Sequence, residues 1–147
     1  MLRGFGILFL CTQRHSTAPL AQHLSHGTVL ALGHYNVRND KVNKNTMLLD
    51  DVIYEVDIAT GKVVWSWKAS EHLDEMGFDE ASLKGMQNYS GKLRGDGDGF
   101  DWFHQNCVSY LGPNKWFDQG DQRFHPDNLI LDSREAGLLG NRGAQKR

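Results

Sequence analysis

The alternation of apolar and polar positions is most regular on either side of one short turn. Apolar side chains alternate with polar or smaller ones along residues 52–56, and they do so again along residues 63–67. Such alternation is typical of β-strands, because successive side chains point to opposite faces. In the turn between them, Asp57 can accept hydrogen bonds from backbone amides ahead of it, and Gly61 can adopt a positive φ. The pattern therefore predicts a β-hairpin.

Shorter apolar runs predict the remaining strands. Residues 27–33, GTVLALG, form an apolar run bounded by glycines, as expected of a buried strand. Residues 36–46 are polar and turn-rich, and they predict a loop. Further strands are predicted at residues 103–111 and 129–133, with a long loop between them. Short strands joined by turn-rich loops indicate an all-β architecture.

Residues 70–89 differ from their surroundings and predict a short helical insertion between strands. Ser70 can cap one short helix, and Asp79 can cap another that carries Leu83 and Met86 on one stripe. The segment that follows is rich in Gly and Asp, which predicts a loop before the next strand.

Length, composition and charge describe one ordinary folded domain. The chain has 147 residues, enough for a core, and its 39% apolar content fits a globular protein. The 16 basic and 18 acidic residues leave a net charge of −2. This balance gives no electrostatic reason to expect nucleic acid or an anionic membrane surface as a partner. No stretch approaches the roughly 20 apolar residues that a membrane-spanning helix needs.

The N-terminal segment and the cysteines leave two questions open. Residues 1–11, MLRGFGILFLC, have only a superficial likeness to a signal peptide, because the apolar run is short and no Ala-x-Ala-like cleavage site follows. Cys11 and Cys107 can form one disulfide in an oxidising compartment or stay as two thiols. Two thiols are the favoured interpretation.

The strongest candidate chemistry lies in residues 95–110, GDGDGFDWFHQNCVSY. If residues 103–110 form a strand, alternation points His104 and Asn106 to the same face. A histidine and an amide side by side at a strand end suit a polar site better than a packed core. Arg134, which follows the next apolar run, adds a cation.

These residues also have plainer interpretations. His104 taken alone is more often a structural histidine bonded to a neighbouring carboxylate, and Arg134 can form a surface salt bridge to Asp132 or Glu135. Cys107 has no activating partner in the sequence and is read as a small buried residue. Three nearby aspartates lack the spacing of a helix–loop–helix calcium site, so a turn-rich loop is favoured over a metal site: Asp96, Asp98 and Asp101.

Two features together resemble the bacterial arylsulfate sulfotransferases. The hairpin VIYEVDIATGKVVWSW is similar to a β-propeller blade with a D-x-x-T-G-K-x-x-W turn, and DWFHQNCVSY followed by LILDSRE resembles that family's Asp-Trp-x-His-x-Asn strand and later Ser-Arg. The resemblance covers roughly residues 27–139. It implies a partial β-propeller, about two blades of a six-bladed propeller with a short helical insertion. Residues 1–26 are then a non-matching N-terminal segment, and residues 140–147 a basic disordered tail.

The resemblance also implies an activity. Such enzymes move a sulfuryl group from a phenolic sulfate ester to a phenolic acceptor, without a nucleotide sulfate donor and via a histidine intermediate. By matching position, His104 is a general acid or hydrogen-bond donor, Asn106 a substrate-binding residue and Arg134 the charge clamp. No cofactor and no metal are implied. The setting implied is periplasmic or secreted, and a homodimer stays open for the full-length form.

The departures from the family pattern predict that the chain is a fragment. Where the family has a further histidine before the first blade turn, this chain has Ala18, Pro19 and Leu20. The histidine that carries the sulfuryl group belongs to a later blade, so the nucleophile is expected to be missing and the chain alone inactive or nearly so. A blade takes about 40 to 50 residues, and propellers usually need at least four blades to close. Two alternatives stay open, a quinoprotein-like propeller enzyme and a non-enzymatic propeller scaffold that binds peptides.

Overall fold

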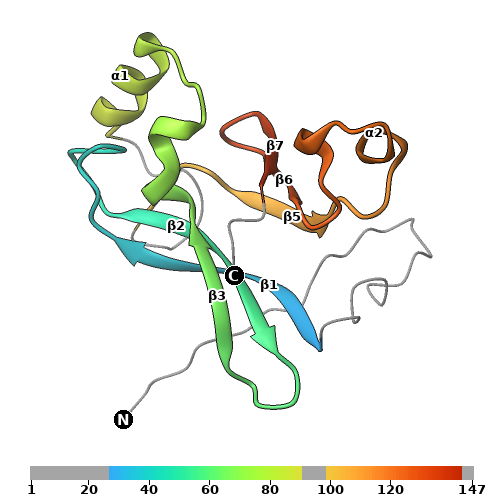
Figure 1. The fold of residues 1–147 in the computed structure, drawn as a ribbon. Helices are drawn as coiled ribbons and strands as arrows, with labels where there is room; N and C mark the ends of the chain where they lie inside the picture. Colours follow the sequence, from blue (N-terminus) through green and yellow to red (C-terminus); the bar gives the residue numbers. More distant parts are fainter. Residues whose placement is uncertain (1–26, 91–98, 144–147) are drawn as a thin grey trace.

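Two antiparallel sheets form the framework of the protein (Figure 1). The structure, a computed structural model, describes residues 27–90 and 99–143. The first sheet has the order β1-β2-β3, and the second has the order β5-β6-β7. The strands of the first are β1 (Thr28–Val37), β2 (Leu48–Asp57) and β3 (Val63–Lys68), and those of the second are β5 (Gln105–Tyr110), β6 (Leu129–Ser133) and β7 (Leu138–Arg142). The predicted all-β class is confirmed, and the pair of three-stranded meanders is compatible with a partial propeller.

The predicted hairpin is formed by β2 and β3. The Asp57 carboxylate accepts hydrogen bonds from the backbone and the hydroxyl of Thr60, both at 2.7 Å. These bonds stabilise the charged form and hold the pKa of Asp57 below its usual value. Gly61 has a φ of +66°, as the turn requires. Local chemistry is therefore sufficient to define this hairpin.

The first strand is longer and less buried than predicted. β1 pairs with β2 along its whole length, from Thr28 opposite Asp57 to Val37 opposite Leu48. The ladder thus takes in residues 36 and 37, which were predicted to be loop. Only Ala31 of this strand is fully buried, because the strand covers the core with one face and leaves the other partly in solvent.

A two-residue strand adds a fourth strand to the first sheet, next to the start of β2. β4 (Phe100–Asp101) pairs in parallel with Leu48 and Leu49, and the Phe100 amide donates to the Met47 carbonyl at 2.7 Å. Just before it, Gly99 lies so close to β2 that a Cβ added there would come within 2.8 Å of the Leu49 nitrogen. The absence of a side chain at this position therefore permits the pairing.

The helical insertion is present, but one of its two predicted caps is wrong. The Asp79 side chain accepts from the Ser82 amide at 2.7 Å and caps α1 (Glu80–Asn88), as predicted. Ser70 caps nothing. It lies inside the 3-10 helix η2 (Ala69–Glu75), and its amide and hydroxyl both donate to Asp50.

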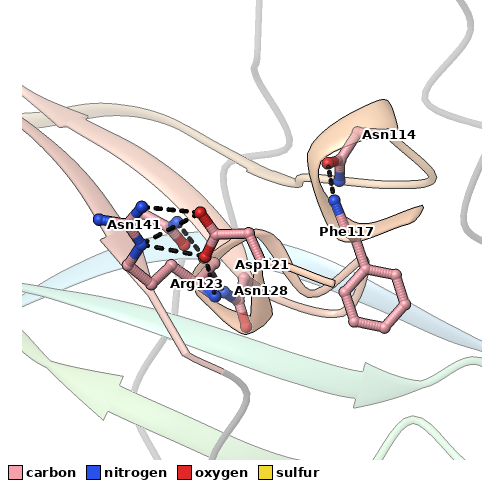
Figure 2. Close-up of polar contacts among 6 residues, drawn as sticks. All are labelled: Asn114, Phe117, Asp121, Arg123, Asn128 and Asn141. Carbon is pink, nitrogen blue, oxygen red and sulfur yellow. Dashed lines mark hydrogen bonds and ion pairs between the residues drawn. The ribbon is translucent and has the colours of Figure 1, made fainter. Parts of the chain in front are cut away.

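The long loop before β6 is organised by asparagine side chains (Figure 2). Asn114 accepts from the Phe117 amide at 3.0 Å and caps α2 (Lys115–Asp118). The 3-10 turn η3 (Gln122–Phe124) follows, and the Arg123 carbonyl accepts from Asn128 at 2.9 Å and from Asn141 at 2.8 Å. The loop is thereby bonded to the last strand of the second sheet.

The predicted C-terminal tail begins too early. A basic disordered tail was expected over residues 140–147, yet Gly140–Arg142 belong to β7 and pair with Leu131, Ile130 and Leu129 of β6. The polarity of residues 140–142 concealed the strand, because Asn141 lies on its exposed face. Residues 144–147 lie outside the described part of the chain.

Candidate functional site

A buried carboxylate anchors the segment that carries the candidate histidine. Asp50 is fully buried and accepts hydrogen bonds from the Ser70 hydroxyl at 2.7 Å, the Trp102 indole at 3.0 Å and the Tyr35 hydroxyl at 3.2 Å. Burial of the Tyr35 hydroxyl, together with the charge of Asp50, raises the pKa of Tyr35. A buried acid needs such donors to offset its lost hydration. Asp50 therefore ties Trp102, two residues before His104, to the first sheet.

His104 lies in a turn and not in a strand. Its φ is +51°, the left-handed region that residues other than glycine seldom adopt, and β5 begins only at Gln105. The pairing of β5 with β6 then shifts register between Gln105 and Cys107. The predicted strand over residues 103–111 was thus too long at its start. The alternation that was to place His104 and Asn106 on one face does not extend to His104.

Backbone hydrogen bonds from β6 and the turn after it hold this left-handed turn. The Arg134 amide donates to the His104 carbonyl at 3.1 Å, and the Glu135 amide donates to the Phe103 carbonyl at 3.3 Å. The Ser133 hydroxyl also donates to the Phe103 carbonyl. Phe103 itself is fully buried in the core. The unusual backbone conformation is therefore stabilised by a segment about 30 residues further along the chain.

The His104 ring is oriented by a carboxylate. Its Nδ1 lies 2.5 Å from the Asp101 Oδ2, and Asp101 is only 7% exposed. Since a carboxylate accepts hydrogen bonds, Nδ1 carries the proton and Nε2 is the nitrogen left for other partners. The His104 side chain is 26% exposed, so the ring is partly accessible to solvent. This is the carboxylate pairing that the plainer interpretation of His104 expected.

A second carboxylate, Asp51, adds negative charge to this region. Asp51 accepts from the Gln105 amide at 3.1 Å, directly after His104. Burial, with the charges of Asp101 and Asp50, raises the pKa of Asp51 to about 7, although the Gln105 bond and His104 act in the opposite direction. The histidine is thus flanked by one carboxylate that orients it and by another that titrates near neutral pH.

The other two predicted site residues are less constrained. Arg134 is brought next to His104 by its backbone, while its guanidinium pairs with Glu135 at 3.0 Å and its side chain is 44% exposed. Asn106 is exposed on β5. In the described part of the chain, no hydrogen bond or ion pair joins the side chains of His104, Asn106 and Arg134 to one another. The fold therefore gathers the three positions, and the side chains themselves point to separate partners or to solvent.

The metal and disulfide alternatives concern residues that are mostly outside the described ranges. Asp96 and Asp98 lie outside the described residues. Within residues 27–90 and 99–143, no group of three or more metal-ligating side chains is found. Cys107 is half-buried in β5, while its candidate partner Cys11 is not described. The choice between a disulfide and two thiols stays a prediction.

A model of the arylsulfotransferase (ASST) family matches residues 16–116, more than half of the chain. The chain belongs to the arylsulfotransferase family. The match confirms the resemblance inferred from the sequence motifs, and it supports aryl sulfate transfer at the level of the family. It begins earlier than the predicted range of 27–139 and ends before Arg134. Comparison with curated proteins and with solved structures gives no match.

Sequence reasoning missed the two adjacent acids, Asp50 and Asp51. They stand at the start of the strand that carries the hairpin pattern, where one of two consecutive side chains must face the core. That doublet was the available signal.

As to membranes, the helices in the described ranges are all too short or too polar to span a bilayer.

Proposed function

We propose that this protein takes part in sulfuryl transfer from a phenolic sulfate ester to a phenolic acceptor, through a histidine intermediate and without a nucleotide donor. The observation that carries the proposal is the His104–Asp101 pair, held in a left-handed turn inside the region that matches the arylsulfotransferase family. Family resemblance also favours a periplasmic or secreted setting and a propeller unit over residues 27–139.

His104 would act on the oxygen that joins the aryl ring to the sulfuryl group. With Asp101 on Nδ1, Nε2 of the protonated ring would give its proton to that oxygen while the sulfur atom bonds to the nucleophilic histidine of the intermediate and its bond to the phenolic oxygen breaks. The phenol then leaves as the neutral alcohol. Asp101 would thus be a positioning residue, since it fixes the tautomer and the orientation of the ring without touching substrate.

Arg134 and Asn106 would hold the sulfuryl oxygens. A guanidinium can bind two oxygens of a planar group at once, and an amide can donate to a third. Arg134 must first exchange its partner Glu135 for substrate. Exposed ion pairs of this kind typically contribute about 0 to 1 kcal/mol, so the exchange costs little. The backbone bond from Arg134 to His104 keeps the guanidinium within the same region of the molecule.

The acidic surroundings of His104 oppose an anionic substrate unless they are neutralised. Asp51 can provide part of this neutralisation, because its raised pKa of about 7 lets it hold a proton near neutral pH. A neutral Asp51 leaves less negative charge around the His104 ring. The arrangement is compatible with an anion bound near His104 at neutral or mildly acidic pH.

The proposal is tested by binding of a phenolic sulfate ester. Titration of the protein with 4-nitrophenyl sulfate should give saturable heat, and Arg134→Ala or His104→Gln should weaken the affinity about tenfold or more, as loss of a charged hydrogen bond implies. Arg123→Ala is the matched control, because Arg123 pairs with Asp121 on an exposed turn. Equal affinity in wild type, Arg134→Ala and Arg123→Ala would remove the assigned role of Arg134.

A further inference from the structure

A pocket of about 250 Å³ is lined by none of the residues assigned to the His104 site, although its wall includes Phe103, the neighbour of His104. It is bordered by β3 and η2 on one side and by the β6–β7 hairpin on the other. Its walls include Trp67, His72, Glu75, Phe103 and Arg142, and they do not include His104, Asp101 or Arg134. This volume is slightly below the roughly 300 to 1,000 Å³ of pockets that take drug-sized ligands. The pocket is therefore suited to a molecule with one ring.

The pocket has aromatic walls. The rings of Trp67 and His72 are stacked, with centroids 5.1 Å apart and planes 9° from parallel. Phe103 packs against Trp67 from another direction, with centroids 6.2 Å apart and a tilt of 56°. Such surfaces favour a flat aromatic partner, since rings gain from offset or edge contacts beyond the burial of area.

One carboxylate organises the polar groups of the pocket. Glu75 receives His72 Nδ1 on one oxygen at 2.8 Å and Arg142 Nη1 on the other. The bond from His72, and then the charge of Arg142, hold the pKa of Glu75 below its usual range. Glu75 stays ionised, and its bonds to His72 and Arg142 largely neutralise its charge. Among these three residues Glu75 is the only acid, so the remaining N–H donors of Arg142 are left for another acceptor.

Two buried donors of pocket-lining residues lack acceptors. Arg142 is only 17% exposed, and Glu75 is its one side-chain partner within the described ranges. Its Nε is buried without a hydrogen bond, and so is Nε1 of Trp67, a residue only 5% exposed. Buried donors are normally paired, so a cluster of unmet donors calls for an acceptor. A ligand that brings oxygen atoms would supply it after a small movement of these side chains.

We propose that this pocket binds a small aromatic carboxylate, with the ring against Trp67 and Phe103 and the carboxylate at Arg142. The planar fork of a guanidinium matches a carboxylate in geometry as well as in charge. The size of the pocket restricts the ligand to about one ring. This is a binding site beyond the sulfuryl-transfer function proposed for the His104 region, and it stands on separate residues.

Titration of the protein with benzoate tests the proposal directly. Benzoate should give saturable shifts of the Trp67 indole signal in ¹H–¹⁵N spectra, and nuclear Overhauser contacts should join its ring protons to Trp67 or Phe103. The Arg142→Gln variant should weaken benzoate binding about tenfold or more. Arg123→Gln is the control, since it also removes one guanidinium, in this case an exposed one paired with Asp121, and it should leave the affinity unchanged. Cyclohexanecarboxylate should bind more weakly than benzoate.

Two results would overturn the proposal. One is the absence of saturable benzoate shifts in the wild-type protein, a measurement that does not depend on any variant folding. The other is displacement of benzoate by phenyl sulfate with both ligands lost in Arg142→Gln, which would make the pocket part of the transfer site. Binding of 4-nitrophenyl sulfate that depends on Arg134, without any benzoate binding, would retain the proposed function and reject the carboxylate site.

Discussion

His72–Glu75 and His104–Asp101 are the same local arrangement in two different environments. In both, Nδ1 of the ring meets a carboxylate three residues away, at 2.8 Å and 2.5 Å respectively. The His72 ring stacks on Trp67, and its carboxylate also binds Arg142. The His104 ring has a second acid, Asp51, close to it, and its own carboxylate is buried. The two pairs differ in the third group: a guanidinium binds the carboxylate of the His72 pair, and an acid with a raised pKa lies near the His104 pair and makes that region sensitive to pH.

Phe103 connects the two environments, and its removal should have the largest effect. This fully buried ring precedes His104 and also lines the pocket beside His72. Phe103→Ala should lower the free energy of unfolding by about 3 to 5 kcal/mol, the usual cost of deleting a buried aromatic ring. Urea denaturation measures this change. Trp116→Ala, at a ring that is 48% exposed, is the control and should cost much less. Similar losses in the two variants would show that Phe103 is not part of a shared core.

Asp51 should make the His104 region, unlike the His72 region, lose stability as the pH rises. Its pKa is raised from 3.8 to about 7 in the folded protein, so the folded state binds the proton more tightly. The associated stability is therefore present below about pH 4, is lost as the pH rises towards 7, and changes no further above it. Asp51→Asn should remove this slope and stabilise the protein at pH 8 by about 2 to 4 kcal/mol.

Urea titrations of both proteins at pH 5 and pH 8 give the comparison for Asp51. Glu75→Gln, in the other histidine pair, is the control and should leave the slope between these two pH values intact. If the free energy of unfolding changed equally between pH 5 and pH 8 in the wild-type protein and in Asp51→Asn, the titration assigned to Asp51 would be contradicted.

The two orienting carboxylates should differ in their importance for stability. Asp101 is buried, so Asp101→Asn should cost about 1 to 3 kcal/mol because the bond to His104 loses its charge. Glu75 is half exposed, and Glu75→Gln should change the unfolding midpoint little. Thermal unfolding of the two variants side by side provides the measurement. A larger loss for Glu75→Gln would reverse the comparison.

The parts of the fold that depend on nearby residues could be predicted from the sequence. The β2–β3 hairpin follows from alternation and from Asp57 and Gly61 in the turn, and the α1 cap follows from Asp79 alone. Ser70 was misjudged because Asp50, 20 residues earlier, competes for its amide and hydroxyl. β7 was missed because its pairing with β6, and not its own composition, makes it a strand.

The residues of the candidate site stay a prediction, and their geometry could not be read from the sequence. The motif around His104 identified the histidine and the arginine, and the family match covers the histidine. The left-handed conformation of His104 depends on hydrogen bonds from Ser133, Arg134 and Glu135, which no local pattern indicates. The role of Asp51 depends on burial and on charges that come together only when β2 meets the turn before β5.

The close approach of Gly99 to β2 makes the position of Asp101 depend on a residue that has no side chain. Any larger residue there would press on the Leu49 backbone and push β4 away from β2. Asp101, the second residue of β4, would move with this strand, and the His104 ring would lose the hydrogen bond that orients it. A saturation mutagenesis library should therefore find residue 99 among the least tolerant sites, although glycine brings no side chain to the site.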